Sequence, residues 1–437
     1  MKNHFRLSLL LSCLFLLWNC QNSVNQSAAS NSNQNFISNP AALDAVLDKY
    51  IDEGYYPFVY ARLEDLAGNV LYEHSKVNQK LLPNTEINKD SWVRIWSMSK
   101  IITISVALDL IEAGVLNFDD PVTKFIPEFE NLKVAVTEDG QQLAALEWDK
   151  KGAACPYQLV PMDSVMTVLH LINHEAGFYY ATTGIACLDN LVAAKNLPTA
   201  KNTDEFIQKL AELPLVMQPG TTDFYGTNTT VLGFVAERAT GKSLKQLVEE
   251  SVTQPMDITG LQYGLPNPSV LPPAFSGKDS ILRQAHQGEL DIFGPDVPDY
   301  DLGHTLYLGG EGMVGTADGY ADFVRMLVKR GTLNGHRFLD KSTVEDIYAP
   351  HTQLDNPYGY NGYNLWVSGD SMRIKSQGDK GLWIGGGYES THFWADPKRE
   401  FVGVVLSQAN FVQAPGYEMN DAFRGALYDQ IFAKEKE

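Results

Sequence analysis

The chain is predicted to fold as a mixed α/β (α+β) protein, with an antiparallel sheet flanked by helices and an inserted, mostly helical part. Residues 58–64 and 69–73 alternate in polarity around an Ala67-Gly68-Asn69 turn, which predicts a hairpin. Helical patterns fill most of the middle of the chain. Strand-like stretches return near the end, at 372–376, 391–395 and 401–407. Both ends of the chain are therefore expected to share one sheet.

Helices are expected between these strands and at the end of the chain. The first begins at Asn39, a capping residue, with Pro40 at the first helical position. A closing helix is predicted near 417–434. The helices in the middle are predicted at 99–113, 163–174, 204–212, 229–239, 243–250 and 317–330.

One large folded domain is expected at 39–430. The chain has 437 residues, of which 44% are hydrophobic and 20% charged, so it can bury a sizeable core and is not disordered. The α/β part is assigned to 39–90 and 365–434, and the helical part to approximately 91–364. No repeat of 20 to 50 residues is present, which argues against a solenoid or a propeller.

The first 20 residues have the pattern of an export signal. Two basic residues precede about a dozen apolar ones, a stretch too short for a convincing membrane span. Cys20 then follows Leu17-Trp18-Asn19, a junction similar to a bacterial lipoprotein processing site, although Trp18 and Asn19 replace the small residues usual there. We expect lipidation at Cys20, with ordinary secretion or a retained anchor as alternatives. Residues 21–38, rich in Asn, Ser and Gln, are predicted to be a flexible linker.

The charge of the chain argues against nucleic acid as a partner. Lys and Arg number 34 against 53 Asp and Glu, for a formal charge of −19, and no basic run opposes this excess locally. The expected partner is a small-molecule ester or amide substrate, as implied by the family resemblance of the blocks that begin at RIWSMSK. A membrane would be contacted only through the N-terminal lipid, in the periplasm or at the outer membrane of a bacterium, and the sequence predicts no oligomeric state.

Two cysteines, Cys155 and Cys187, fall in the predicted domain. Export would permit a disulfide between them, and two separate buried thiols fit the sequence equally well. Cys155 belongs to 131–163, a polar segment that is expected either to shape substrate access or to be a plain surface excursion.

Ser97 and Lys100 give the strongest chemical signal. They stand three residues apart at the start of a predicted helix, so one turn places them on one face. Alone, Ser-x-x-Lys usually marks a helix start with an exposed lysine. Here the following helix is apolar nearly all round, which predicts a buried Lys100. Burial disfavours the ammonium form and makes an amine that can accept the serine proton more accessible.

The segment RIWSMSK at 94–100 opens a series of blocks that resembles the class C β-lactamase and family VIII carboxylesterase superfamily. The blocks keep the order of that family across about residues 40–430: GVLNFDDPVTKFIPEF at 114–129, MTVLHLINHEAGF at 166–178, GGEGMVGTADGYADFVRML at 309–327 and FWADPKREFVGVVLSQ at 393–408. The resemblance implies a β-lactamase/transpeptidase-like fold, related to the penicillin-binding proteins. It also implies a serine hydrolase that works through an acyl-enzyme on Ser97 without a cofactor.

The resemblance further implies a catalytic tyrosine on a loop before a helix, and Tyr225 in the segment FYGTNTT fits that place. By itself Tyr225 would more often be a core residue. Gly226 and Thr227 replace the Ser and Asn usual in the family, and Asn228 lies one residue late, so Thr227 and Asn228 are both candidates for substrate binding. We expect Lys100 and Tyr225 to share the proton of Ser97 as a coupled pair.

The third motif departs most from the family pattern. The Lys-Thr-Gly of true β-lactamases is absent, and the equivalent stretch LWIGGGYESTHFW lies at 382–394. Gly386 and Gly387 permit close backbone approach, and the N–H of Tyr388 with that of Ser97 is expected to form the oxyanion hole. A tight turn before an edge strand explains the glycines equally well. Without the lysine, efficient penicillin hydrolysis is not expected.

His170 and His174 are four residues apart, a spacing that can bind zinc. No carboxylate or cysteine completes such a site convincingly, so we predict a structural role and no metal. No Gly-x-Ser-x-Gly elbow is present, which argues against an α/β-hydrolase.

The sequence thus predicts a serine hydrolase, with a carboxylesterase on small acyl esters favoured. A β-lactamase, a D-alanyl-D-alanine carboxypeptidase and a D-aminopeptidase are the alternatives within the enzyme class. A non-catalytic relative that binds peptidoglycan or a partner is the alternative of another class.

Overall fold

The computed structural model describes residues 36–286, 288–289, 292–293, 300–353, 357–375, 377–416 and 418–436. The predicted signal, Cys20 and most of the predicted linker lie outside these residues. Residues from Phe36 onward form one compact unit. Phe36 and Ile37 are buried, and the Phe36 ring packs on Phe401 with ring centroids 5.0 Å apart. The packed part therefore begins three residues before the predicted start at Asn39.

An antiparallel sheet of eight strands, counted over the described residues, is the main layer. Its order is β12 (Thr352–Gln353), β13 (Gly359–Asn361), β14 (Trp366–Ser368), β15 (Trp383–Gly387), β16 (Thr391–Asp396), β17 (Phe401–Leu406), β1 (Phe58–Asp65) and β2 (Val70–Val77). β1 pairs with both β2 and β17, with Tyr60 opposite Leu406. The expectation that both chain ends share one sheet is confirmed. The sheet also takes in β12 and β13, which the boundary predicted at 365 had placed in the helical part.

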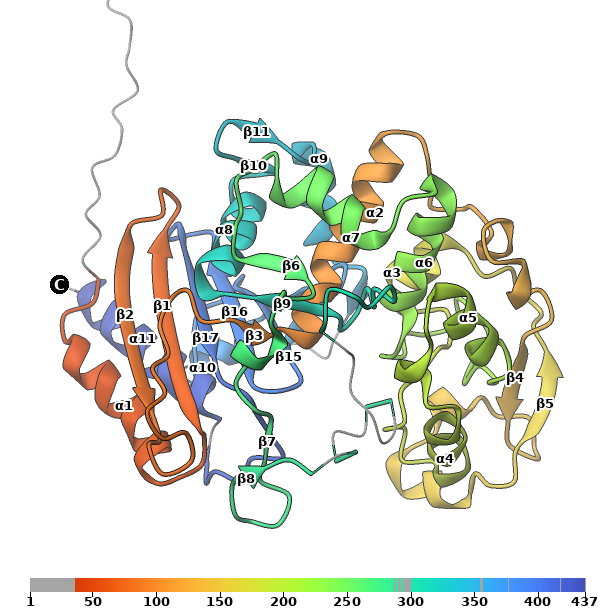
Figure 1. Cartoon of the computed structure of the whole chain (residues 1–437), viewed down its shortest axis with the longest axis horizontal. Helices are drawn as coiled ribbons and strands as arrows, with labels where there is room; N and C mark the ends of the chain where they lie inside the picture. The colour runs from red at the N-terminus through yellow and green to blue at the C-terminus, as the bar shows by residue number, and fades with distance from the viewer. Residues whose placement is uncertain are drawn as a thin grey trace, which may run out of the picture. The chain divides into compact units, whose positions relative to one another are not determined.

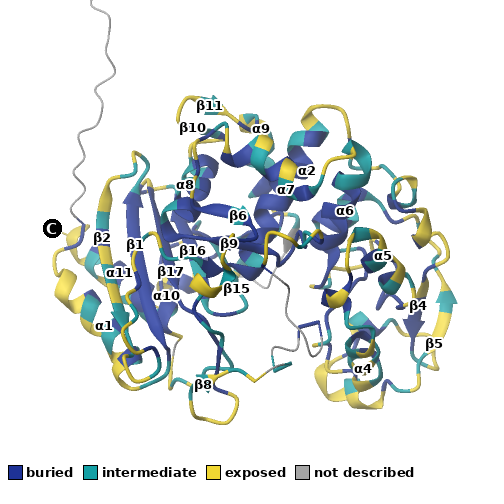
Figure 2. Cartoon of the chain, in the orientation of Figure 1, coloured by how far each residue is buried: buried dark blue, intermediate teal, exposed yellow. Residues whose placement is uncertain are grey.

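Helices cover both faces of this sheet. α1 (Pro40–Asp52), which Asn39 caps through its side chain, packs with α11 (Met419–Lys434) on one face, and α8 (Ala317–Val328) packs against β17 on the other (Figure 1). Every residue of β17 and nearly every residue of β1 is buried, as expected for strands covered on both sides (Figure 2).

The remaining helices form most of the second part of the unit. α2 (Ser99–Glu112) contacts α6 and α7 and is buried on nearly all sides, as its apolar sequence predicts. The other helices are α3 (Val168–Ile172), α4 (Ala186–Lys195), α5 (Thr203–Ala211), α6 (Asn228–Thr240), α7 (Leu244–Val248), α9 (Lys341–Ile347) and α10 (Ser371–Ile374).

Four small sheets accompany these helices in the described residues. Their strands are β3 (Val93–Arg94), β9 (Met313–Gly315) and β6 (Leu261–Tyr263); β4 (Lys133–Val136) and β5 (Gln158–Pro161); β7 (Phe275–Ser276), β8 (Arg283–Gln284) and β18 (Ala409–Asn410); and β10 (Thr332–Leu333) and β11 (His336–Arg337). β4 and β5 belong to the polar segment 131–163. Cys155 of this segment is joined by a disulfide to Cys187 in α4, so of the two alternatives for these cysteines the structure shows the bridge.

Two sequence predictions of local structure are wrong. The strand predicted at 372–376 is the short helix α10, because an apolar-polar alternation of five residues fits a single helical turn as well as a strand. The helix predicted at 163–174 is reduced to α3. It begins only where Thr167 forms a capping box with His170, and it ends before His174, whose φ of 59° is left-handed.

No helix among the described residues is long and apolar enough to cross a membrane.

Candidate active site

Ser97 lies in a 3-10 turn, Trp96–Met98, between β3 and α2. Trp96 just before it is fully buried and has a φ of 46°, a left-handed conformation that is uncommon for a bulky side chain. Such strain persists only where the surroundings fix it, and it is frequent at functional sites. Ser97 is partly exposed while its neighbours on both sides are buried. The turn therefore leaves the Ser97 side chain accessible while the residues next to it are buried.

Lys100 lies one turn further, on the same face of the chain as Ser97. Its Nζ is 3.1 Å from Ser97 Oγ, 2.9 Å from Tyr180 Oη and 3.0 Å from the carbonyl oxygen of Gly310. The lysine is fully buried, as its sequence context predicts. With Glu311 Oε1 at 3.3 Å, four oxygens lie at hydrogen-bonding distance from Nζ, one more than the three N–H donors of an ammonium group.

Glu311 is a fully buried carboxylate beside this lysine. Its Oε1 lies 3.3 Å from Lys100 Nζ and also accepts a hydrogen bond from the hydroxyl of Tyr180, while Oε2 accepts one from Thr230, 2.6 Å away. The sequence analysis did not identify Tyr180 or Glu311 as site residues. One signal in the sequence could have indicated Glu311, namely that it is the charged residue of the glycine-rich stretch 309–315. A carboxylate that is buried there requires a partner.

Two glycines of that stretch allow the close packing that brings Glu311 to the site. A Cβ on Gly309 would lie 2.6 Å from the carbonyl oxygen of Thr229, and a Cβ on Gly310 would lie 3.1 Å from Lys100 Nζ. The chain here passes directly between α2 and α6, so a side chain at either position would push it away from the lysine.

Tyr180 is a neutral hydrogen-bond relay in this cluster. Burial, reinforced by the negative charge of Glu311, raises the pKa of Tyr180 well above its ordinary value. Its hydroxyl therefore stays protonated. It donates a hydrogen bond to Glu311 and accepts one from Lys100.

Tyr225 lies on the open side of Lys100. Its side chain is 51% exposed, and the centre of its ring is 4.9 Å from Lys100 Nζ. The ring stacks on His174, with ring centroids 5.0 Å apart and an angle of 11° between the planes. The structure therefore brings together the three residues that the sequence predicts as catalytic, and their roles in catalysis stay predictions.

Gly226, which departs from the family pattern, has a packing reason. A Cβ at this position would lie 2.2 Å from the carbonyl oxygen of Phe178 and 2.5 Å from Tyr179 Cα. The loop that carries Tyr225 thus lies directly on the segment that carries Tyr180, and a serine would force the two tyrosines apart.

His174 supports the Tyr225 ring from within the core. Its ring nitrogens lie 3.3 Å from Asn228 Nδ2 and 3.2 Å from Thr229 Oγ1. Burial, with the positive charge of Lys100, lowers the pKa of His174 to about 3, so the ring is neutral at ordinary pH. His170, four residues earlier, accepts a hydrogen bond from the backbone N–H of Thr167 in the cap of α3. No group of three or more potential metal ligands gathers among the residues that the structure describes.

Thr227 and Asn228 are both fully buried. The amide of Asn228 donates to the carbonyl oxygens of Phe178 and Phe224, 3.4 and 3.2 Å away. Their predicted contact with substrate stays a prediction, and the burial favours a role in holding the loop of Tyr225.

Gly387, at the end of β15, faces the nucleophile segment. Gly385, Gly386 and Gly387 belong to the strand itself and not to a turn that precedes it. In the described register, β14 pairs only with Trp383 and Ile384, whereas β16 pairs with β15 as far as Gly387. A Cβ on Gly387 would lie 2.3 Å from the carbonyl oxygen of Ile95. Gly387 is therefore needed for the close approach of β15 to the turn of Ser97.

A buried ion pair and an aromatic contact secure that approach. Arg94 Nε lies 2.8 Å from Glu389 Oε2, which links β3 to the chain just after β15. The Tyr388 ring packs edge-on against Trp96, with centroids 5.4 Å apart. Tyr388 is thus held against the residue before Ser97, and the oxyanion hole expected at the N–H groups of Ser97 and Tyr388 stays a prediction. Gly386 lies in β15, just before this point.

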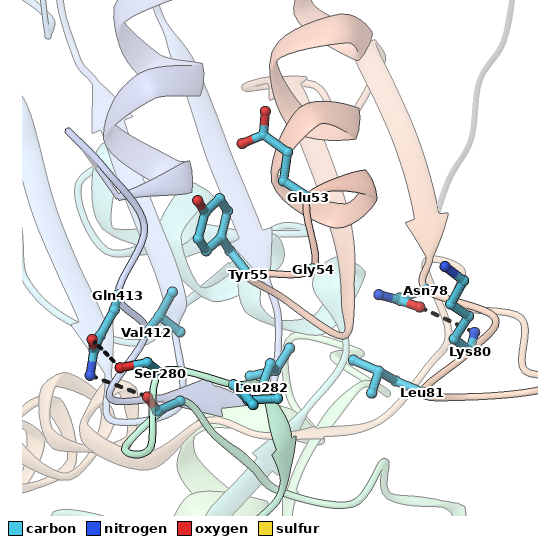
Figure 3. A pocket seen from close by; sticks show the side chains of 12 residues that line it. Glu53, Gly54, Tyr55, Asn78, Lys80, Leu81, Ser280, Leu282, Val412 and Gln413 are labelled. Atoms are coloured by element: carbon cyan, nitrogen blue, oxygen red, sulfur yellow. Dashed lines mark hydrogen bonds between the residues drawn. The ribbon is translucent and has the colours of Figure 1, made fainter.

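A cavity of about 240 Å³ opens beside Tyr225. Its lining is mostly polar and comes from three parts of the chain, namely Asn173, His174, Asp223 and Tyr225; Asn361, Gly362, Asn364 and Trp366; and Ile384, Gly385 and Gly386. Another cavity, of about 350 Å³, lies between the end of α1, the end of β2 and the β7–β8 hairpin, and shares none of these residues (Figure 3).

The sequence profile of the Beta-lactamase family matches residues 67–424. The chain belongs to the Beta-lactamase family. The matched range includes Ser97, Lys100, Tyr225 and β15. The mixed fold and the serine β-lactamase and penicillin-binding-protein-like superfamily, both predicted from the sequence, are confirmed.

Members and structural neighbours of the family include enzymes with different acyl chemistry. An uncharacterised protein of Mycobacterium tuberculosis is 28% identical over 391 residues, covering 86% of this chain and 90% of that protein. The ML-236A carboxylate methylbutanoyltransferase of Penicillium citrinum is 26% identical over 269 residues, covering 62% and 58%. Among solved structures, EstCE1, described as a hydrolase with promiscuous acyltransferase activity, has a TM-score of 0.73 at 21% identity, covering 90% of this chain and 99% of that one.

The lining of the cavity beside Tyr225 also bears on which charges a substrate could carry. No Lys or Arg is among the described residues that line the cavity beside Tyr225, and Asp223 contributes a carboxylate. A substrate carboxylate, which the lysine of the Lys-Thr-Gly motif would bind, finds no cation in this lining.

Proposed function

We propose that this chain is a serine hydrolase that forms an acyl-enzyme on Ser97 and acts on small acyl esters. The observation that carries the proposal is the contact of 3.1 Å between the partly exposed Ser97 hydroxyl and the fully buried Lys100 amine, with the Tyr225 ring directly above the amine. A nucleophile within reach of a base that is itself held by other groups is the arrangement that covalent catalysis requires.

The proposed reaction has two halves. Ser97 Oγ bonds to the acyl carbon while its proton passes to the Lys100/Tyr225 pair, and the carbonyl electrons move to the oxygen. The backbone N–H groups of Ser97 and Tyr388 stabilise that oxyanion. When the carbonyl re-forms, the bond to the alkoxy group breaks, and the pair returns the proton to the departing alcohol. Water then repeats the sequence on the acyl-enzyme and releases the acid.

The cleft supports an ester over a β-lactam or a peptide with a free carboxylate. The acidic, amide-rich lining beside Tyr225 repels a carboxylate, whereas a neutral ester places no charge there. The proposal therefore ranks the carboxylesterase above the β-lactamase and the D-alanyl-D-alanine carboxypeptidase. A D-aminopeptidase, whose substrates have a free amine, ranks between them.

Acyl transfer to an alcohol is the second candidate. It is supported by the similarity to the methylbutanoyltransferase of Penicillium citrinum and by the description of EstCE1. The same acyl-enzyme serves both reactions, and the second half differs only in whether water or an alcohol attacks it.

The test compares a short-chain p-nitrophenyl ester with a chromogenic cephalosporin, using the purified 21–437 fragment and its Ser97→Ala variant. Ester turnover that exceeds cephalosporin turnover at least a hundredfold, and that Ser97→Ala abolishes, supports the proposal. Fast cephalosporin hydrolysis overturns the substrate assignment, and inactivity towards both favours a peptidase or a non-catalytic binding protein. Repeating the ester assay with added short-chain alcohol, and measuring the new ester by mass spectrometry, tests for acyl transfer.

We also propose that the chain is exported and anchored through lipid on Cys20. The Cys155–Cys187 disulfide supports export, because disulfides persist in oxidising compartments. Expression of the full chain in a bacterium, followed by mass spectrometry of the mature N-terminus, tests this. A lipid-modified Cys20 is the expected result, and an unmodified N-terminus in the soluble fraction would contradict it.

A further inference from the structure

The buried side of the site contains a carboxylate that the two-residue Lys100/Tyr225 scheme does not use. Glu311 is fully buried, contacts Lys100 directly, and is fixed by Tyr180 and Thr230. A buried charge without a partner is costly, so a carboxylate retained in this position has a consequence for the lysine beside it.

Hydrogen-bond donors and acceptors around Lys100 can be assigned almost completely. The carbonyl oxygen of Gly310 can only accept, so it takes one N–H of Lys100. The Tyr180 hydroxyl donates its hydrogen bond to Glu311, so its oxygen accepts from Lys100. Two acceptors remain for the third N–H, Ser97 Oγ at 3.1 Å and Glu311 Oε1 at 3.3 Å. The shorter contact, with Ser97 Oγ, is the one that differs between the two charge states. An ammonium donates to Oγ, whereas a neutral amine offers it a lone pair.

The histidine and the buried tyrosines around this pair are neutral, and beyond Tyr300 lies the Arg94–Glu389 ion pair. On the lysine side, burial and the charge of Lys100 keep the pKa of His174 at about 3. On the carboxylate side, burial raises the pKa of Tyr180, Tyr263 and Tyr300 above the ordinary value for tyrosine, and the Tyr300 hydroxyl donates to the backbone carbonyl of Glu311.

The cluster therefore contains one acid and one base in direct contact. Within the described residues of the cluster, Lys100 and Glu311 are the charged pair, and the Tyr225 ring lies 4.9 Å from Lys100 Nζ on the open side. In a low-dielectric site, opposite charges 3.3 Å apart favour each other's charged forms.

We propose that Glu311 is a positioning residue that holds Lys100 as an ammonium, so that Tyr225, and not Lys100, accepts the proton of Ser97. The ammonium donates to Ser97 Oγ, which turns the serine proton away from the lysine and towards the open side where Tyr225 lies. In the acylation step, the Oγ–H bond breaks, the proton goes to the Tyr225 phenolate, and Oγ bonds to the acyl carbon. Lys100 keeps its three protons throughout and stabilises the phenolate through charge. This inference rests on the proposed function, because it assumes acylation of Ser97.

The test uses Glu311→Gln, which keeps the shape and removes the charge. Its matched control is Glu64→Gln, which removes a carboxylate that is 3% exposed and paired with Arg62 on β1, outside the site. The kcat/KM of p-nitrophenyl ester hydrolysis is measured from pH 5 to 10.5 for the wild type and both variants. Without the counter-ion, Lys100 loses its proton more easily, so the alkaline loss of activity should begin at least one pH unit lower in Glu311→Gln and at the wild-type pH in Glu64→Gln.

Two results would overturn the proposal. If Lys100 is the base, Glu311→Gln should instead gain activity on the acidic side, because a neutral amine becomes available at lower pH. If the pH profile of kcat/KM is the same in Glu311→Gln as in the wild type, Glu311 has no role in the charge of Lys100. Labelling of the wild type with a fluorophosphonate is measured in parallel. A wild type that does not label at Ser97 refutes the proposed function, and a wild type that labels while the Glu311→Gln profile is unmoved refutes this inference alone.

A second measurement decides the question if Glu311→Gln does not fold. The ¹⁵Nζ resonance of Lys100 is recorded in the wild-type chain labelled at lysine side chains, and assigned by its loss in Lys100→Arg. An ammonium resonance that persists from pH 6 to 9 supports the proposal, and a neutral amine resonance in that range contradicts it.

Discussion

The two sides of Ser97 differ in burial, in packing and in charge. On the inner side, Lys100, Tyr180 and Glu311 are buried, and each polar atom described there has a hydrogen-bond partner. On the outer side, Tyr225 is 51% exposed and borders a polar cavity. In the proposed mechanism, this difference separates two roles. The inner side would fix charge and geometry before substrate arrives, and the outer side would contact substrate and accept the proton.

This division predicts that inner-side variants lose both stability and activity, whereas outer-side variants lose activity alone. Lys100→Met gives the largest combined effect. The ester kcat/KM should fall by about a thousandfold or more, and the free energy of unfolding by about 3–5 kcal/mol, because Glu311 is left as an unpaired buried charge. Denaturant unfolding and steady-state kinetics measure the two losses.

A double variant checks the reason for the stability loss. Lys100→Met with Glu311→Gln removes both charges, so it should recover most of the lost stability and none of the activity. A single variant as stable as the wild type would show that the two residues do not form an ion pair.

Two tyrosines offer a direct comparison of the sides. Tyr225→Phe should lower kcat/KM by about a hundredfold or more, the usual range for loss of a general base, with the melting temperature nearly unchanged. Tyr180→Phe should lower kcat/KM by less than Tyr225→Phe but cost about 1–3 kcal/mol of stability, because it leaves Glu311 and Lys100 each short of a partner. The reverse ranking of activities would place the base on the inner side.

The approach of β15 to the nucleophile turn is tested by a pair of glycine variants. Gly387→Ala places a Cβ 2.3 Å from the carbonyl oxygen of Ile95, so the strand must shift and the Tyr388 N–H with it. We expect about a tenfold or greater loss of kcat, since removal of an oxyanion donor elsewhere costs 10²–10³. Gly152→Ala, where a Cβ meets nothing within 4 Å, is the control and should keep wild-type kinetics. Equal kinetics for both variants would refute the oxyanion assignment at Tyr388.

The smallest effect at neutral pH concerns His174. Its pKa is about 3 in the folded chain and about 6.5 when unfolded, so the unfolded state binds the proton more readily. Stability from the neutral ring is complete above pH 6.5 and is lost as the pH falls towards 3, by about 3 kcal/mol at pH 4. His174→Asn, which tolerates the left-handed backbone, should therefore lose less stability than the wild type between pH 7 and pH 4. Parallel unfolding curves across that range would contradict this.

The sequence predicted the fold well where local pattern and family order agree. The hairpin of β1 and β2, the buried helix α2 and the closing helix α11 all follow from periodicity and capping. The prediction was wrong at α10 because five residues of alternation carry too little information to separate a strand from one helical turn.

The site was predicted in part, for a physical reason. Ser97, Lys100 and Tyr225 were found because their types and spacing carry the chemistry. Tyr180 and Glu311 were missed because they lie 80 and 211 residues from Lys100 in the chain. Their proximity to Lys100 follows from the packing of α2, α6 and the glycine-rich stretch. The packing reason for Gly226, likewise, lies in a segment almost 50 residues away.

Trapping of the acyl-enzyme tests the central claim most directly. The purified chain is mixed with p-nitrophenyl butyrate, quenched in acid within milliseconds, and digested for peptide mass spectrometry with fragmentation that separates Ser97 from Ser99. The account predicts one butyryl group on Ser97, its absence in Ser97→Ala, and at least a 10⁴-fold loss of turnover in that variant, in the range for loss of a nucleophile. A butyryl group on another residue, or turnover by Ser97→Ala within tenfold of the wild type, would contradict it.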